Sequence, residues 1–132
     1  MPIQAIAFRL PSGAQGVRAD CTGTVTKEEA EAWLRQVEPG GPFHGLPVLA
    51  VAQRLDRLTA DARGVYAKLG NSAPEVERWI AVVVTNSVLR VTANFVMRIT
   101  KKRKMRLFRT EEEAVRWLDD RLRADAAGKA AP

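Results

Sequence analysis

The stretch RWIAVVVTNSVLRVTANFVMRITKKRKMRLFRT, residues 78–110, decides the fold that the sequence predicts. It opens with an apolar, β-branched run at 79–84, which is typical of a buried strand. Over 88–99 the apolar residues recur three and four positions apart, as on one face of a helix. A second apolar run, with Met105, Leu107 and Phe108, reads as another strand. Together these patterns predict a strand–helix–strand unit.

Positive charge gathers in the same stretch. It holds nine of the 21 Lys and Arg residues and no acidic residue, leaving 12 basic and 15 acidic residues in the rest of the chain. The net charge of +6 is therefore a local feature, and seven of the positive charges lie within 98–109. Because four contiguous charges at 101–104 cannot all enter a core, they indicate a solvated turn.

This basic turn is the candidate binding feature of the chain. It would suit the acidic patch of a partner protein, an anionic lipid surface or nucleic acid, and the alternative is a solubilising turn without a ligand. Nucleic acid is the least favoured of the three, because the nearby aromatic residues alternate into core-like positions. The candidate interaction patch consists of Arg90, Arg98, Lys101, Lys102, Arg103, Lys104, Arg106 and Arg109.

Upstream of this stretch, the chain reads as a hairpin followed by a helix. Residues 3–10 form the first expected strand, and 17–22 alternate apolar and polar residues as a half-buried strand does. A capping box formed by Thr26 and Glu29 starts the helix. Its apolar positions, at helical spacing, are Ala30, Trp33, Leu34 and Val37.

The alternation of strands and helices continues after a loop rich in Pro and Gly at 38–47. A short apolar run at 48–51 predicts a central strand buried on both faces, and Thr59 caps the next expected helix. Thr110 begins the last helix with a second capping box. The resulting order, β-β-α-β-α-β-α-β-α, predicts an α/β fold with a mixed, mostly parallel sheet and four helices.

Length and composition indicate one globular domain. We expect it to span 1–123, with a flexible tail at 124–132. The single cysteine excludes a disulfide framework within the chain. The N-terminal residues do not have the pattern of a signal peptide, and no apolar run approaches the roughly 18 residues of a membrane span. We therefore expect a cytoplasmic protein.

Three segments resemble one known family. They are GTVTKEE at 23–29, WIAVVVT at 79–85 and RLFRTEEEAVRWL at 106–118. With the order of the elements, they resemble the STAS domain, the fold of sporulation anti-anti-sigma factors, and more closely its SpoIIAA-like branch, also labelled STAS/CRAL-TRIO-like. The resemblance covers about residues 3–123. It implies a regulatory domain that binds a partner and catalyses no reaction.

The resemblance also implies a candidate phosphorylation site. In the anti-anti-sigma members, a partner kinase modifies a Ser or Thr where a helix begins after the central strand, and Thr59 holds the matching position. The family pattern is Asp-Ser-Ser-Gly-like, whereas residues 58–61 here read Leu-Thr-Ala-Asp. Thr59 is therefore interpreted either as a plain N-cap or as a regulated hydroxyl, and a helix N-terminus tolerates phosphate.

No residue pattern predicts catalysis. His44 is the only histidine and lies in the Pro- and Gly-rich loop, while Cys21 falls inside an expected strand. Dinucleotide, phosphate-loop and zinc-protease motifs do not occur in the sequence. We therefore expect no enzyme activity, no cofactor and no metal. The leading hypothesis is a regulatory protein-interaction module, which could form a homodimer. The alternative is a protein that binds lipid or an anionic membrane surface.

Overall fold

The computed structural model describes residues 3–38, 40–70, 79–84 and 105–130. The expected helix over 88–99 and the basic run at 101–104 lie outside these described residues. The elements within them are β1 (Ile3–Arg9), β2 (Gln15–Val25), α1 (Lys27–Val37), β3 (Val48–Leu58), α2 (Ala60–Gly70), β4 (Ile80–Val83), β5 (Met105–Phe108) and α4 (Glu111–Ala130).

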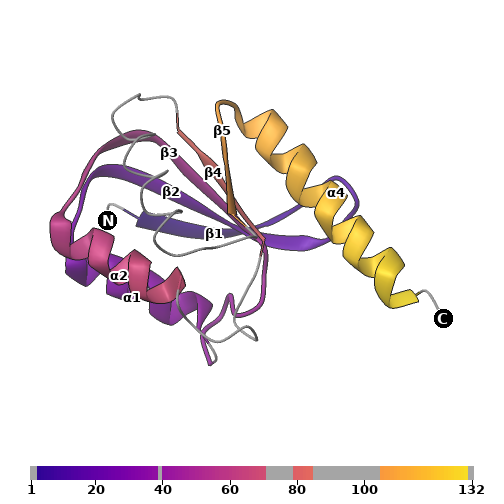
Figure 1. Ribbon diagram of the computed structural model, residues 1–132, viewed down its shortest axis with the longest axis horizontal. Helices are drawn as coiled ribbons and strands as arrows, with labels where there is room; N and C mark the ends of the chain where they lie inside the picture. Colours follow the sequence, from indigo (N-terminus) through magenta and orange to yellow (C-terminus); the bar gives the residue numbers. More distant parts are fainter. Residues whose placement is uncertain (1–2, 39, 71–78, 85–104, 131–132) are drawn as a thin grey trace.

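The strands form one sheet in the order β1-β2-β3-β4-β5 (Figure 1). β1 is antiparallel to β2, and the other neighbouring strands are parallel. The predicted α/β class is therefore confirmed, with a mostly parallel sheet that carries a hairpin strand at one end. β3 lies at the centre and is buried on both faces as predicted, because Val48 joins one core cluster while Leu49 and Val51 join the other.

The two long strands of the sheet are β2 and β3, with 11 residues each against four in β4 and β5. The strand expected at 48–51 was therefore too short. Its polar continuation stays in the sheet because residues up to Leu58 pair with β2. The register shifts near Gly23, whose φ of +63° lies in the left-handed region that glycine adopts without strain. Such irregularities bend and twist a strand pair, and β2 and β3 curve toward α1 and α2 in Figure 1.

α1 and α2 lie side by side on one face of the sheet (Figure 1). The amide of Thr26 donates to the Glu29 carboxylate at 3.3 Å, as expected for the predicted capping box. All four apolar positions predicted for this helix are buried, and they pack with residues of β2 and β3. Helical periodicity in the sequence therefore identified the face that meets the sheet.

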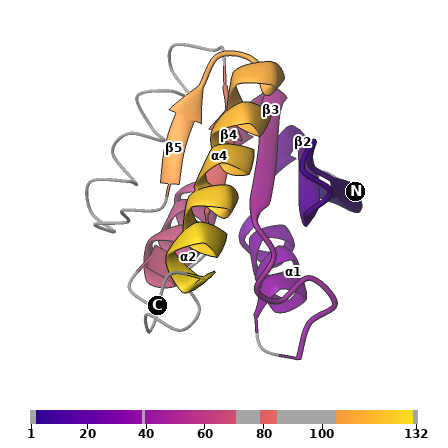
Figure 2. The same cartoon turned by 90° about the vertical axis from the view of Figure 1, so that its right-hand side faces the viewer.

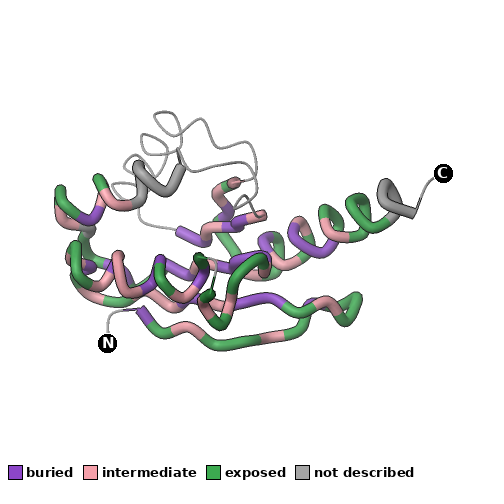
Figure 3. The backbone as a smooth tube through the Cα atoms, turned by 90° about the horizontal axis from the view of Figure 1, so that it is seen from below, coloured by how far each residue is buried: buried purple, intermediate pink, exposed green. Residues whose placement is uncertain are grey.

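α4 covers the opposite face of the sheet. Ala114 and Leu118 are fully buried and pack against Leu49, Val83 and Phe108. The helix was expected to end near residue 123, but it continues to Ala130 and projects beyond the sheet (Figure 3). The division into a domain at 1–123 and a flexible tail at 124–132 stays a prediction. No helix in the described part of the chain is long and apolar enough to cross a bilayer.

Candidate interaction surface

Two residues of the candidate patch lie in the described part of the chain, and both are exposed. Arg106 is on β5, an outer strand of the sheet, and Arg109 follows in the turn before α4. The Arg106 guanidinium lies 5.6 Å from the centre of the Phe108 ring, a cation–π contact. Among the described residues neither guanidinium forms an ion pair, so both charges face solvent. Arg90, Arg98, Lys101, Lys102, Arg103 and Lys104 lie outside the described residues.

Thr110 and the acidic residues after it explain why α4 begins where it does. The Thr110 hydroxyl accepts a hydrogen bond from the Glu113 amide at 3.2 Å, which satisfies one free amide of the first turn. Three glutamates then occupy the first turn, where negative charge is favourable. The turn that carries Arg109 is therefore held in place by the start of a stable helix.

Thr59 lies at the start of α2, directly after the central strand β3. Its hydroxyl accepts a hydrogen bond from the Ala62 amide at 3.2 Å, so the side chain acts as an N-cap. Its own amide donates to the carbonyl of Val25 at 3.1 Å, which joins the ends of β2 and β3. The residue is half-buried. The structure thus confirms the N-cap interpretation, while its modification stays a prediction.

Arg18 joins β2 to the first turn of α4. Its two terminal nitrogens donate to the Glu111 carboxylate at 2.7 and 2.8 Å, and its Nε donates to Asp20 at 3.1 Å. The hydrogen bonds from Arg18 lower the pKa of Glu111. Hydrogen bonds to Glu111, and then to Asp20, raise the pKa of Arg18. These three charged side chains are therefore bonded to one another within the fold.

Asp119, on α4, forms a second link, which joins this helix to the turn between β1 and β2. Its side chain is nearly inaccessible, and one carboxylate oxygen accepts from the amide of Ser12 at 3.2 Å and from the Ser12 hydroxyl. The other oxygen accepts from Arg123, one helical turn further along. Hydrogen bonds from Ser12 and then Arg123 lower the pKa of Asp119, so it stays ionised. Each oxygen of this buried carboxylate thus accepts a hydrogen bond.

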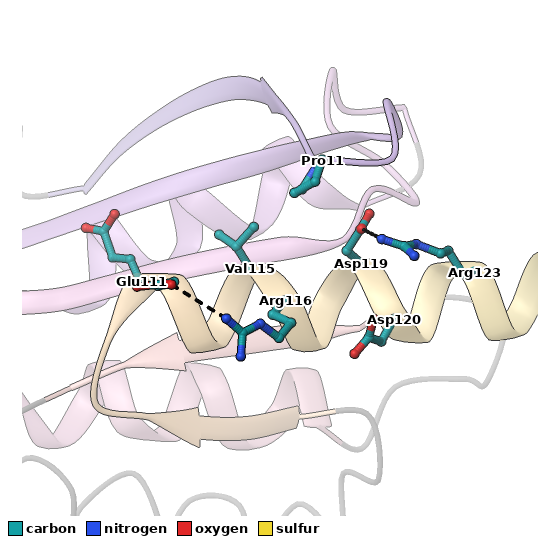
Figure 4. Close-up of a pocket in the computed structure, with 8 residues that line it drawn as sticks. Pro11, Glu111, Val115, Arg116, Asp119, Asp120 and Arg123 are labelled. Carbon is teal, nitrogen blue, oxygen red and sulfur yellow. Dashed lines mark hydrogen bonds and ion pairs between the residues drawn. The ribbon is translucent and has the colours of Figure 1, made fainter.

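An open groove of about 530 Å³ lies between α4 and the β1–β2 turn. Figure 4 shows Pro11 and Val115 beside it, with Glu111 and Asp119 along the helix. Its charges are largely balanced, because Arg116 pairs with Glu112 in addition to the pairs of Glu111 and Asp119. Paired charges attract an ionic ligand weakly, so the groove is a poorer candidate site than the exposed arginines. The groove is lined by Pro11, Glu111, Glu112, Val115, Arg116, Asp119, Asp120 and Arg123.

An aromatic cluster fastens α4 to the strands beneath it. Trp79 meets Trp117 edge to face at 5.6 Å, and Trp117 also contacts Phe108 at 5.5 Å. The Arg121 guanidinium lies over both tryptophan rings, at 5.6 and 6.0 Å from their centres. Trp79 Nε1 also donates to the Asp125 carboxylate at 2.6 Å. Because Phe108 is the last residue of β5, this cluster also packs α4 against the strand that carries Arg106.

The Cys21 thiol contacts the carbonyl of Ala19, at 3.9 Å, and not His44. The Cys21 thiol packs against the core beneath α1, and burial, followed by the charge of Asp20, raises its pKa to about 12. The thiolate that would act as a nucleophile is therefore disfavoured near neutral pH. His44 is exposed in the loop before β3. Among the described residues, no three His, Cys, Asp or Glu side chains group as metal ligands.

Reasoning from the sequence missed Arg18 and Asp119. Arg18 contacts a residue 93 positions away, and no local pattern signals such a contact. Asp119 and Asp120 are adjacent carboxylates on α4, and adjacent residues of a helix point about 100° apart. Their exposure follows that geometry, since Asp119 is 2% exposed and Asp120 lies at the surface. A helical wheel of α4 places Asp119 on the side of Val115 and Leu122, four residues before it and three after it, and this is the signal that could have indicated its burial.

Comparison with known proteins identifies a family and a fold. A family model described as a domain of unknown function, DUF7793, matches residues 43–122, which is more than half of the chain. No curated protein matches the sequence. A solved structure of an uncharacterized DUF3478-family protein from Shewanella loihica PV-4, which has a SpoIIAA-like fold, aligns with a TM-score of 0.63. The identity is 17%, and the alignment covers 88% of this chain and 93% of that one. The predicted SpoIIAA-like fold is thereby confirmed.

Proposed function

The chain belongs to the DUF7793 family, and we propose that it is a regulatory module without enzyme activity that binds an acidic surface of a partner protein. The binding surface is the basic segment at 98–109, with Arg90 beside it in the sequence. The SpoIIAA-like fold is compatible with such a role. The protein would work in the cytoplasm, without a cofactor, and its effect would come from occupying the partner.

The observation that carries this proposal is a contrast among the arginines. Arg18, Arg116 and Arg123 are each neutralised by a carboxylate within 3.5 Å. Arg106 and Arg109 form no ion pair within the described ranges; the same holds for Arg54 and Arg57, but of these four only Arg106 and Arg109 adjoin the basic run at 101–104 in the sequence. They lie on an outer strand and the turn after it, where a partner has access. Residues 101–104, all basic, directly precede this strand in the chain. Unpaired charges of one sign attract an acidic surface and speed association with it.

The test is a pull-down with charge-reversed protein. We expect Arg106→Glu combined with Arg109→Glu to abolish recovery of a partner that wild-type protein retains. The matched control reverses Arg54 and Arg57, which are equally exposed at the far end of β3. Because all four arginines lie at the surface, each double variant should fold like the wild type, as circular dichroism will show. Equal recovery by both double variants would remove the basic surface from the proposal.

A flotation assay with anionic vesicles is the experiment that separates protein binding from lipid binding. Each basic side chain near an anionic membrane contributes about 1 kcal/mol, so seven charges would give clear flotation at low salt. The protein-partner proposal predicts that this flotation disappears at moderate salt, where the partner is still recovered. Flotation that persists at moderate salt, and is lost in the variant reversed at Arg106 and Arg109, would replace it with the lipid-binding alternative.

Thr59 would provide the regulation. Phosphate there would add negative charge at the N-terminus of α2, close to the exposed Asp56 and Asp61. Because its hydroxyl already caps the helix, a modified side chain would change this end of the sheet. Thr59→Glu should therefore alter partner recovery, whereas Thr59→Ser should leave it unchanged. Identical recovery for both variants would remove the regulatory role of Thr59.

A further inference from the structure

The outer edge of β1 is an open strand edge. β1 pairs with β2 on one side, and no described strand pairs with its other side. Figure 2 shows the indigo N-terminal strand at the border of the sheet, with no labelled element beyond it. Ile6, at the middle of this strand, is 54% exposed, the large hydrophobic side chain that stands out at the surface of the described residues. An edge of this kind presents unpaired backbone groups to another strand.

The two edges of the sheet differ in their protection against such pairing. β5 is four residues long, carries the exposed Arg106 and is preceded by the basic run at 101–104. Short length and positive charge are two of the means by which proteins block edge strands. β1 has seven residues, no Pro, no Lys and an unbroken register with β2. Its one charged residue, Arg9, lies at its end. β1 is therefore the edge suited to pairing.

We propose that β1 pairs antiparallel with β1 of a second copy of this chain, across a twofold axis that passes beside Ile6. The two sheets then join into one continuous sheet, and Ile6 lies directly opposite its counterpart. Opposed side chains in an antiparallel pair are about 5 Å apart, so each isoleucine covers the other. This inference is independent of the basic surface and of any partner that it binds.

The sequence of β1 is self-complementary in this register. Gln4 lies opposite Phe8, and Ala5 lies opposite Ala7, so no bulky pair collides. Arg9 lies opposite Ile3, and the two arginines of the dimer are therefore at opposite ends of the paired strands. The twofold axis brings together no like charges from β1. Apolar cross-strand pairs at the centre with charges kept apart are the pattern that stabilises antiparallel pairing.

The inference commits to a small interface, since each chain contributes mainly one seven-residue strand. Interfaces of this size form weak dimers. The wild-type protein should therefore change from monomer to dimer between about 10 µM and about 500 µM, as measured by sedimentation equilibrium. Protein that stays monomeric over this whole range would overturn the proposal.

Position 6 provides a sharper test, because the twofold axis places it opposite itself. Ile6→Lys alone and Ile6→Glu alone should each weaken dimerisation at least about tenfold, since like charges then face each other. An equal mixture of the two variants should recover a dimer that contains one copy of each, which native mass spectrometry identifies by mass. Both variants should keep the wild-type melting temperature within a few degrees, because Ile6 is exposed in the monomer.

The control variant is Thr22→Lys, which adds the same charge to an exposed position of β2 rather than to the edge. It should dimerise like the wild type. A dimer that survives Ile6→Lys, or a mixture that shows no preference for the Lys–Glu combination, would overturn the proposed pairing.

Discussion

The link between Arg18 and Glu111 allows a quantitative test of how α4 is held on the sheet. The perturbations are Arg18→Met, Glu111→Gln and the two combined. Each removes the charge pair while keeping most of the side-chain volume. The coupling free energy is the amount by which the losses of unfolding free energy in the two single variants, added together, exceed the loss in the double variant.

The expected magnitude follows from geometry and exposure. Two unit charges 4 Å apart attract by about 1 kcal/mol in bulk water and by about 4 kcal/mol in the environment near a protein surface. The side chains are 31% and 37% exposed, so water screens the pair and its ordering costs side-chain entropy. Exposed pairs measure roughly 0.2–1 kcal/mol, and this one makes two short hydrogen bonds. We therefore expect a coupling of about 1 kcal/mol.

Urea unfolding of the four proteins at neutral pH measures this coupling. Asp20→Asn is the control, because Asp20 also accepts a hydrogen bond from Arg18 and loses this partner in the Arg18→Met variant. Since the pKa of Glu111 is lowered in the folded state, the coupling should be complete above the ordinary Glu pKa of about 4.3 and disappear as the pH falls through the lowered value. A coupling below about 0.3 kcal/mol at neutral pH would refute the assignment of this pair as a link between β2 and α4.

Three further predictions concern the core, the buried carboxylate and the cap. Leu118→Ala should lower the unfolding free energy by about 3 kcal/mol and the melting temperature by roughly 10 °C, because the side chain is fully buried; a loss below about 1 kcal/mol would contradict its place in the core. The lowered pKa of Asp119 should add stability that is present above about pH 4 and lost as the pH falls through the lowered value, and Asp119→Asn should remove that dependence. An unchanged acid profile would contradict this contribution. Thr59→Ala should cost about 1 kcal/mol in urea unfolding and Thr59→Ser little, and equal stability of all three proteins would exclude the cap.

Features that depend on local periodicity were predictable from the sequence. The buried stripe of α1 was recognised because apolar residues repeat with the helical period, and the Thr caps were recognised because capping depends on residues three positions apart. The order of strands and helices led to the correct class of fold because parallel strands need crossover helices. The resemblance then identified the SpoIIAA-like branch, which the structural comparison confirms.

Features that depend on distant contacts were not predictable. The polar half of β3 does not look like a strand, and it becomes one because β2 continues beside it. The pairing of Arg18 with Glu111 and the burial of Asp119 arise when α4 packs on the sheet, because the partners Arg18 and Ser12 lie 93 and 107 residues away in the sequence. At the candidate site, Arg106 and Arg109 are exposed, whereas the solvated turn predicted at 101–104 lies outside the described residues and stays a prediction. The other patch residues lie outside the described part of the chain.

The most direct test of the proposed function is a binding titration with the partner recovered by wild-type protein. Its dissociation constant should rise at least about tenfold for the protein with Arg106→Glu and Arg109→Glu, and it should stay within about twofold for the protein reversed at Arg54 and Arg57. The wild-type affinity should also fall as salt rises, because the contact joins opposite charges. Equal affinity of both double variants for the partner would contradict the claim that the basic surface mediates binding.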